Sequence, residues 1–270
     1  MLNIYTTFFD LDKIAESGQC FRWKKTGEQA YEIPAYGKTL NIRQEGDCLH
    51  LDCTQAEYDE IWRDYFDLAS DYGQYEQELR TRSDTNSYLY EATTAARGIR
   101  ILKQDLWEVI VSFIISQNNN IPRIKGCIEK LCERFGSFPD AKQILDGGMK
   151  GLDGLGLGYR QQYILAAALL YHGNGDGSTE KELRSLDYKE AIKSLLSWFG
   201  IGPKVANCIC LFGLGHKEAF PRDVWVKRIE AEHFDGHFPE ENYPGYGGVL
   251  QQYIFFYERS RKQRNEIDSK

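Results

Sequence analysis

The segment Leu195–Ala206 has the sequence Leu-Leu-Ser-Trp-Phe-Gly-Ile-Gly-Pro-Lys-Val-Ala. An apolar helix is expected to end at Gly200, and a second helix to begin at Pro203, because the fixed φ of proline suits a first helical turn. The two glycines allow positive φ and a close backbone approach, and Ile201 can be buried to fix the turn. Exposed amides beside a helix N-terminus can bind one phosphate. The segment therefore predicts a helix–hairpin–helix in which Gly200 and Gly202 contact DNA; the alternative is a plain corner between two helices.

Lys204 lies in the predicted first turn of the second helix. Most lysines are solvated surface residues, and that is the simpler interpretation of this one. The helix dipole, however, disfavours a positive charge at this end of a helix. Partial burial would favour the neutral amine further, and a neutral amine can form a Schiff base. Lys204 is therefore the candidate nucleophile.

Asp223 follows Lys204 by 19 residues, within the segment Ala219–Trp225. The simpler interpretation is that Asp223 caps a helix beginning near Val224, since aspartate is a favoured N-cap residue. The two roles are compatible, because a capping carboxylate is fixed in orientation. If it stays ionised, it can face a developing cation. Asp223 is the candidate acidic partner.

The rest of the chain has a strand-rich beginning and a helical remainder. Short, partly alternating segments separated by glycine turns predict strands at 19–23, 31–36, 39–43 and 48–51. Thr54 and Glu57 form a predicted capping box. Apolar patterns predict helices at 106–117, 121–135, 159–171, 187–199 and 203–211.

We therefore expect an α+β fold. A small N-terminal antiparallel β-sheet domain with a flanking helix should occupy residues 1–80. It should lie beside a mostly helical body, residues 81–270, that carries the helix–hairpin–helix motif at about 187–213.

The composition is that of a globular protein, with 42% hydrophobic and 27% charged residues. Its apolar runs are shorter than the roughly 18 residues of a membrane helix. The N-terminus lacks the basic-then-apolar pattern of a signal peptide, so we expect a cytoplasmic protein without membrane contact. Seven cysteines with no CxxC pair favour free thiols and no metal site. The net charge of -7 argues against nucleic acid, but a local backbone contact can bind phosphate regardless.

Four segments, in order along residues 17 to about 256, resemble one known family. The stretch 200–209 with Pro221–Val224 resembles the helix–hairpin–helix glycosylases with a Gly/Pro-rich loop and a distal aspartate. Ser17–Trp23, Ser116–Ile124 and Leu155–Arg160 narrow the resemblance to the 8-oxoguanine DNA glycosylases of the eukaryotic type, of which this chain resembles a prokaryotic relative. The four segments together are specific evidence for this resemblance, whereas any one of them alone would be weak evidence.

The resemblance implies a role for each matched position. Lys204 matches the nucleophile, Asp223 its electrostatic partner, and Gly18 the residue whose carbonyl accepts from N7–H of 8-oxoguanine. Only the oxidised base carries that hydrogen. Cys208 and Phe255 match the residues that sandwich the flipped base, and Gln251 matches the residue that contacts its pairing edge. Asn118 matches the residue that enters the vacated space, and Tyr159 matches a wedge in the base stack. Arg123 and Arg160 match residues that contact the opposite cytosine.

Each of these other positions has a structural alternative. The run Asn118–Asn120 could end one helix and cap the next. Tyr159 and Phe255 could pack in the core, and Arg160 could be a surface residue. Two departures concern the active site: Trp225 stands where the family commonly has a histidine, and Gln117 stands where the eukaryotic members usually have a serine.

The expected activity is excision of 8-oxoguanine from duplex DNA by base flipping, Schiff-base formation and β-elimination. A monomer without metal or organic cofactor is expected to carry it out on double-stranded DNA. The alternatives are a monofunctional glycosylase for alkylated bases, which would not use Lys204, and a non-catalytic helix–hairpin–helix module, which would need neither Lys204 nor Asp223.

Overall fold

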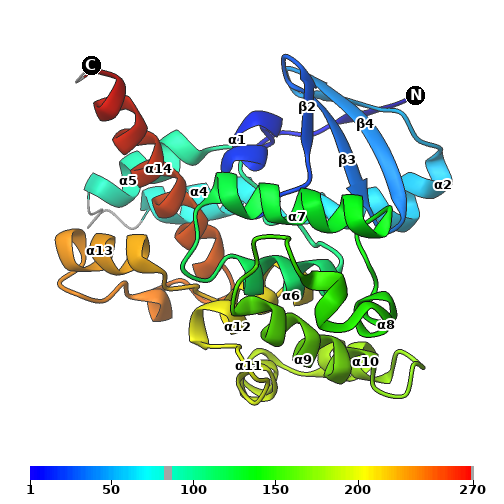
Figure 1. Ribbon diagram of the computed structural model, residues 1–270. Helices are drawn as coiled ribbons and strands as arrows, with labels where there is room; N and C mark the ends of the chain where they lie inside the picture. Colours follow the sequence, from blue (N-terminus) through cyan, green and yellow to red (C-terminus); the bar gives the residue numbers. More distant parts are fainter. Residues whose placement is uncertain (82–86, 269–270) are drawn as a thin grey trace. The chain divides into compact units, whose positions relative to one another are not determined.

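The computed structural model describes residues 1–81 and 87–268. The chain forms two compact units. The first contains residues 1–103 and 222–270, and the second contains residues 104–221. Figure 1 labels the helices and strands of both units.

The first unit contains a five-stranded antiparallel sheet. Its strand order is β1-β5-β4-β3-β2, and its strands are β1 Leu2–Tyr5, β2 Lys24–Gly27, β3 Ala30–Ala35, β4 Lys38–Glu45 and β5 Cys48–Leu51. Alternate residues of β3 are buried, and Ile33 lies opposite Leu40 of β4. This period-2 burial is what a sheet with one covered face requires. It is also the signal that predicted three of these strands.

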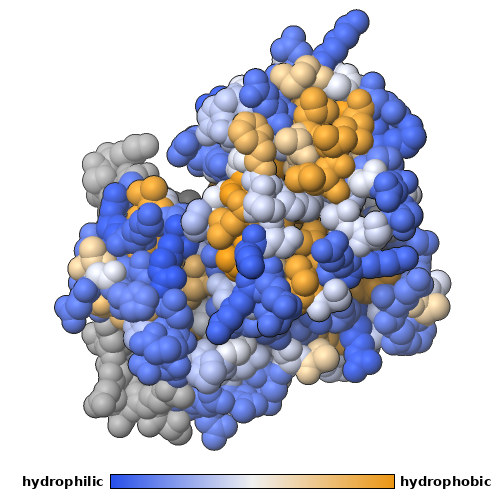
Figure 2. Space-filling model, turned by 90° about the horizontal axis from the view of Figure 1, so that it is seen from below, coloured by the Kyte–Doolittle hydropathy of each residue, from blue (hydrophilic) through white to orange (hydrophobic). Residues whose placement is uncertain are grey.

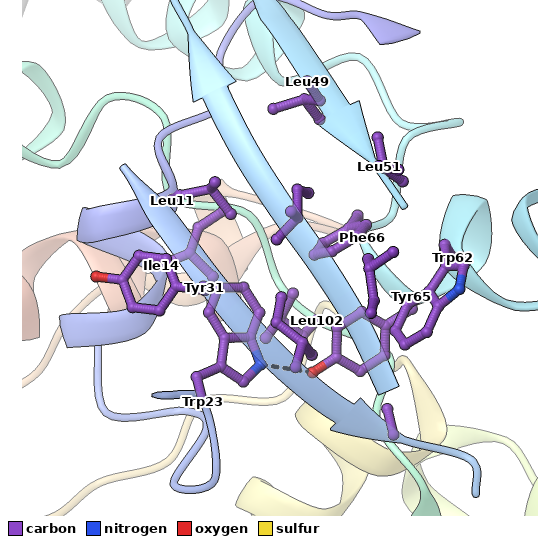
Figure 3. Packing of buried hydrophobic residues seen from close by; sticks show 14 of the residues in the cluster. Leu11, Ile14, Trp23, Tyr31, Leu49, Leu51, Trp62, Tyr65, Phe66 and Leu102 are labelled. Carbon is purple, nitrogen blue, oxygen red and sulfur yellow. Dashed lines mark hydrogen bonds between the residues drawn. The ribbon is translucent and has the colours of Figure 1, made fainter. Parts of the chain in front are cut away.

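A hydrophobic core covers that face of the sheet (Figure 3). Leu11 and Ile14 of α1, Leu11–Glu16, contribute to it and are fully buried. The Trp23 indole N–H donates to the hydroxyl of Tyr65, at 2.8 Å, so a buried donor is satisfied inside the core. Tyr65 belongs to α3, Arg63–Tyr65, which follows the helical turns α2, Gln55–Glu57, and η1, Tyr58–Trp62. The capping box predicted at Thr54 is confirmed.

The predicted strand at 19–23 is wrong, because this segment is a loop between α1 and β2. The carboxamide of Gln19 is fully buried and bonds to the backbone of residues at 100–102 instead of a sheet partner. Its Nε2 donates to the Arg100 carbonyl at 2.8 Å, and its Oε1 accepts from the Leu102 amide at 2.8 Å. These contacts come from distant sequence, so local alternation could not reveal them.

Helices from both ends of the chain complete the first unit. They are α4 Tyr72–Thr81, α5 Ser87–Ala96, α13 Val224–His233, the 3-10 turn η3 Glu240–Asn242 and α14 Gly247–Asp268. The C-terminal α14 packs against α5 and α13, as Figure 1 shows for α5. The units therefore divide the chain differently from the boundary near residue 80 expected from the sequence. The sequence offered no signal for this pairing of distant helices.

The second unit is helical. Its elements are α6 Leu106–Ile115, α7 Ile121–Phe135, α8 Ala141–Leu152, α9 Arg160–His172, α10 Ser178–Ser185, α11 Tyr188–Leu196, α12 Pro203–Ile209 and the π-helical turn η2 Cys210–Leu214. Nine of the residues of α6 are buried, as its uniformly apolar sequence predicts. The bounds of α7 match the prediction, with Gly136 in the left-handed region at its end. The α+β class is confirmed.

Among the described residues, the helices are all too short or too polar to traverse a lipid bilayer. The seven cysteines are free thiols in the structure, as expected.

Candidate active site

The helix–hairpin–helix joins α11 to α12 through a short turn. Gly200 has a φ of +86°, and a Cβ placed on it would lie 2.2 Å from the ring of Tyr163. Glycine is therefore required at position 200 by both conformation and space. Ile201 is buried, as predicted, and its amide donates to the Trp198 carbonyl at 3.1 Å. The turn is thus fixed by one glycine, one buried side chain and one backbone hydrogen bond.

Gly202 differs from the prediction of positive φ. Its φ is -96° and it is the N-cap of α12, so an ordinary residue could adopt this backbone. No atom lies within 4 Å of a Cβ built on it, so its missing side chain leaves open space. The first amides of α12 have no carbonyl partner within their own helix. These amides lie beside the open surface at Gly202, in the kind of place where the sequence predicts a phosphate contact.

Lys204 is the second residue of α12 and is half-buried. Its Nζ donates to Ser116 Oγ at 2.9 Å and lies 5.0 Å from the centre of the Phe113 ring. Both partners belong to the end of α6, in the same unit. The amine therefore lies against a fixed surface of the protein, which contradicts the interpretation of Lys204 as a freely solvated side chain.

Gln117 links the same segment to the hairpin. Its Nε2 donates to the Gly200 carbonyl at 3.0 Å, and its own carbonyl accepts from Arg160 Nε at 2.9 Å. Where the eukaryotic relatives usually have serine, this longer side chain reaches the hairpin. Gln117 thereby connects the loop after α6 to the turn that precedes Lys204.

Asn118 and Tyr159 lie together on the surface of the second unit. Asn118 is exposed, has a φ of +46° and donates through Nδ2 to the Tyr159 hydroxyl at 3.1 Å. Tyr159 is 47% exposed, contrary to the alternative of a core residue. Its ring contacts Tyr163, and Tyr163 contacts Phe199, which is 60% exposed. A row of aromatic rings thus runs from Asn118 to the hairpin.

Leu169 and Leu170 of α9 and Leu196 of α11 are also exposed. On the side where α9 and α11 lie in Figure 1, Figure 2 shows apolar residues gathered among hydrophilic ones. A base stack could contact such a surface, since bases stack on aromatic side chains.

The two arginines predicted to contact the opposite cytosine lie in different surroundings. Arg123 is exposed near the start of α7, where its amide is capped by Asn120 Oδ1 at 3.0 Å. Arg160 is 4% exposed, and its guanidinium donates to the carbonyls of Gln117, Asn118 and Leu157. The alternative of a surface role for Arg160 is wrong. In this conformation Arg160 holds the loop that carries Asn118.

Cys208 is buried on α12, one turn after Lys204. Its neighbour Asn207 accepts from the Tyr188 hydroxyl at 2.7 Å and from the Phe220 amide at 3.1 Å. These bonds join α12 to α11 and to the segment before residue 221. The sequence analysis assigned Asn207 no role, because its partners lie 19 and 13 residues away.

Asp223 belongs to the first unit, where it is the N-cap of α13, as predicted. Its Oδ1 accepts from the Val226 amide at 2.9 Å. The preceding residue, Arg222, donates through Nε to Glu230 Oε1 at 2.8 Å and through Nη2 to Glu240. Glu230 is buried and also accepts from the Phe238 amide at 3.1 Å. Burial opposes the charge of Arg222, but the bonds to Glu240 and Glu230 outweigh it and raise the pKa of the guanidinium.

Trp225 occupies the position where the family commonly has histidine. Its ring lies 5.0 Å from Lys262 Nζ and 5.8 Å from the Arg228 guanidinium. Two cations thus accompany the indole near the start of α13, and the ring face attracts both.

The residues predicted to recognise the base in the first unit lie as follows. Gly18 is half-buried with a φ of +81°, between the anchored side chains of Ser17 and Gln19, which bond to each other at 2.9 Å. Gln251 is 3% exposed, and its Oε1 accepts from Gln252. Phe255 is half-buried, with the Arg259 guanidinium 5.5 Å from its ring centre.

One cluster has the residue types of a metal site. His237, Glu240 and Glu241 can bring ligand atoms within 4.8 Å of one another. Glu240, however, accepts from Arg222, and its Oε2 lies 3.7 Å from His237 Nε2. Ion pairing accounts for the arrangement.

Ser116 is a close partner of Lys204 that the sequence does not single out, although it lies inside a segment that carries the family resemblance. The available signal is its place at the end of an almost entirely buried helix, since a polar residue there tends to hydrogen-bond a neighbour in the fold.

Two family models match the chain in succession. Residues 1–110 match the N-terminal domain of 8-oxoguanine DNA glycosylase. Residues 111–237 match the HhH-GPD superfamily of base excision DNA repair proteins.

Individual relatives agree with these models. The N-glycosylase/DNA lyase of Saccharomyces cerevisiae is 31% identical over 257 residues, which cover 81% of this chain and 66% of the yeast protein. A structure of MBOgg1 in complex with a low-affinity DNA ligand is 34% identical, with a TM-score of 0.88 and 96% of each chain covered. The Clostridium acetobutylicum 8-oxoguanine glycosylase/lyase, in complex with DNA containing cytosine opposite 8-oxoG, is 29% identical with a TM-score of 0.87, covering 95% of this chain and 94% of the other.

The two glycines of the hairpin should respond differently to replacement by alanine. Gly200→Ala should lower the free energy of unfolding by about 1–3 kcal/mol, because it combines positive φ with a clash against Tyr163. Gly202→Ala is the matched control and should cost less than about 1 kcal/mol, since it loses only the preference for glycine over alanine at the N-cap of α12. Urea denaturation followed by circular dichroism measures both, and equal losses would contradict this account of the turn.

Proposed function

This chain belongs to the 8-oxoguanine DNA glycosylases of the HhH-GPD superfamily, and from that membership we propose that it excises 8-oxoguanine from duplex DNA and cleaves the resulting abasic strand. The chain spans 66% of the length of its yeast relative, and the proposal concerns the part that this chain contains. The observation that carries it is the position of Lys204: its amine is held at 2.9 Å from Ser116 on the helix that follows the hairpin.

The first step is extrusion of the damaged nucleotide. The glycosidic bond is shielded inside a duplex, so the base must leave the stack at a cost of a few kcal/mol. Asn118 and Tyr159 are exposed and hydrogen-bonded to each other, and the Tyr159 ring contacts half-buried Tyr163, which in turn contacts exposed Phe199. This supports a role for the pair in filling the vacated space and wedging into the stack.

DNA is held through local contacts in spite of the net charge of -7. The hairpin and the first amides of α12 bind one phosphate, with Gly202 leaving room for its approach. Such a contact depends on backbone dipoles and not on the total charge of the protein.

The chemical steps use Lys204 and Asp223. The neutral amine of Lys204 attacks C1′ while the bond to N9 breaks, and the purine leaves with the electron pair and takes up a proton. The amine gives up its proton as the new C–N bond forms, and ring opening yields a Schiff base that undergoes β-elimination. Asp223 stabilises the oxocarbenium character of the sugar electrostatically.

Base recognition is assigned to the residues that match the base-contacting positions of the family. The carbonyl of Gly18 accepts from N7–H of 8-oxoguanine, a hydrogen that guanine lacks. The anchored side chains of Ser17 and Gln19 on either side support a fixed carbonyl. By the same match, Cys208 and Phe255 stack on the flipped base, and Gln251 contacts its pairing edge.

We propose that the protein acts as a monomer on chromosomal DNA in the cytoplasm, since one chain supplies every predicted catalytic and recognition group. The fold alone is compatible with a monofunctional alkylated-base glycosylase or a non-catalytic DNA-binding module. The immobilised amine of Lys204 favours the bifunctional enzyme over both.

Lys204→Gln should abolish excision and borohydride trapping on a duplex with one 8-oxoguanine, because glutamine cannot form the Schiff base. Binding of the same duplex should persist. Lys193→Gln, an exposed lysine of α11, is the matched control and should trap normally. Trapping that survives in the Lys204 variant would sink the assignment.

Asp223→Asn should reduce the single-turnover excision rate on the order of 100-fold, through loss of charge stabilisation at the sugar. The fold should persist, since asparagine also caps helices well. Asp187→Asn, the same change at the N-cap of α11, controls for capping. An Asp223 variant as fast as the wild type would refute the electrostatic role.

Arg123→Ala should relax the preference for cytosine opposite the lesion roughly 10-fold or more, as loss of a bidentate base contact would. Arg134→Ala, another exposed arginine of α7, is the control. Arg160→Ala should additionally lower the melting temperature, because its guanidinium satisfies three carbonyls. Selectivity is measured as excision of the lesion opposite each of the four bases. Unchanged selectivity in the Arg123 variant would show that Arg123 does not recognise the opposite cytosine.

A further inference from the structure

Ser116 is the C-cap residue of α6, the most completely buried helix of the second unit. Its amide donates to the Ser112 carbonyl at 3.0 Å, and its hydroxyl donates to the Phe113 carbonyl at 2.8 Å. The residue is thus fixed by backbone and side chain together. Since α12 packs directly on α6, the serine lies on a rigid support opposite the nucleophile.

The direction of the serine hydrogen bonds determines what Ser116 can offer to Lys204. A hydroxyl has one hydrogen and two acceptor lone pairs. The hydrogen is committed to the Phe113 carbonyl, so Oγ faces the lysine only as an acceptor. One N–H of the amine is thereby held, while the nitrogen lone pair of the neutral amine stays outside this contact.

Two further interactions act on the same amine. The Phe113 ring, 5.0 Å from Nζ, attracts a cation through its face. The start of α12 has the opposite effect, because the helix dipole disfavours positive charge there. Ser116 Oγ is the directional contact among these three, so it determines where Nζ lies.

We propose that Ser116 is a positioning residue for the reaction, holding the ε-amine of Lys204 in a fixed direction by accepting a hydrogen bond from it. This inference rests on the proposed function, in which Lys204 is the nucleophile. Lysine has a flexible four-carbon stem, so a fixed acceptor near its end removes rotations that would carry the amine away from C1′. Ser116 acts through Lys204 and makes no bond to the DNA in this proposal.

The first arm of the test measures catalysis in Ser116→Ala. The single-turnover excision rate and the rate of borohydride trapping should fall roughly 10- to 100-fold, the range expected for a displaced reacting group. The dissociation constant for the lesion duplex should stay within about 3-fold of the wild-type value, since no DNA contact is removed. Ser116→Thr keeps the hydroxyl and should restore most of the rate, which a purely structural effect of side-chain size would not do.

The second arm needs no DNA. Acetylation of Lys204 by an activated acetyl ester, measured by peptide mass spectrometry against exposed Lys193, should rise several-fold in Ser116→Ala, because the amine is released from the acceptor that holds it. It should be unchanged in Ser116→Thr. Ser112→Ala, a buried serine one turn earlier on α6, is the matched control for both arms.

The combination of slower excision and faster acetylation is the expected result. Unchanged acetylation in Ser116→Ala, or a threonine variant as slow as the alanine variant, would overturn the positioning role. If the alanine variant does not fold, Ser116→Cys, with a weak sulfur acceptor, should show the same two changes in reduced degree, and wild-type behaviour there would also overturn it. A wild-type protein that neither excises nor traps would refute the proposed function, while the acetylation arm would still decide whether Ser116 holds the amine.

Discussion

The hydrogen bonds between the end of α6 and the hairpin organise the second unit. Gln117 Nε2 bonds the Gly200 carbonyl, and Lys204 Nζ bonds Ser116 Oγ, so two consecutive residues hold both the turn and the amine. The support is rigid because nine of the ten residues of α6 are buried, and close-packed interiors deform little. From the other side, Arg160 donates to the carbonyls of Gln117 and its neighbour. The loop that carries Asn118 is therefore fixed by the same network that holds the amine of Lys204.

The hairpin shows how an acidic protein can bind a polyanion. Gly200 is needed for the fold of the turn, since its φ is positive and Tyr163 occupies the place of a Cβ. Gly202 has an ordinary backbone and open space around it. In the proposed DNA contact, its missing side chain lets a phosphate approach the amides closely. The two glycines look equivalent in sequence but differ in the structure. Gly200 allows the turn to form, whereas Gly202 leaves the surface of the turn open. In the proposed DNA contact, backbone dipoles supply an attraction for phosphate that does not depend on the net charge.

How far the sequence predicts the structure depends on the range of the interactions involved. The bounds of α7, the caps at Thr54 and Asp223 and the buried strand positions follow from local periodicity and capping, which act over a few residues. The segment at 19–23 has the local pattern of a strand, but it forms a loop, because Gln19 bonds to residues about 80 positions away. Burial of Arg160 and the Ser116 contact likewise depend on partners 43 and 88 residues distant. Such contacts are decided by tertiary packing, which one sequence does not display.

In the first unit, Trp225 stands where the family commonly has a histidine, and other residues order the start of α13. With Trp225 in that place, an indole replaces the titratable side chain near Asp223. The indole lies close to Lys262 and to Arg228. Order at the start of α13 comes instead from Arg222, the residue before Asp223, whose guanidinium is bonded to buried Glu230 and to a second carboxylate. Because an arginine keeps its charge at every pH at which DNA is stable, this anchor does not titrate as a histidine would. The Asp223 carboxylate keeps its cap bond to the Val226 amide. The ion pairs of Arg222 with Glu230 and Glu240 hold the residue that precedes it.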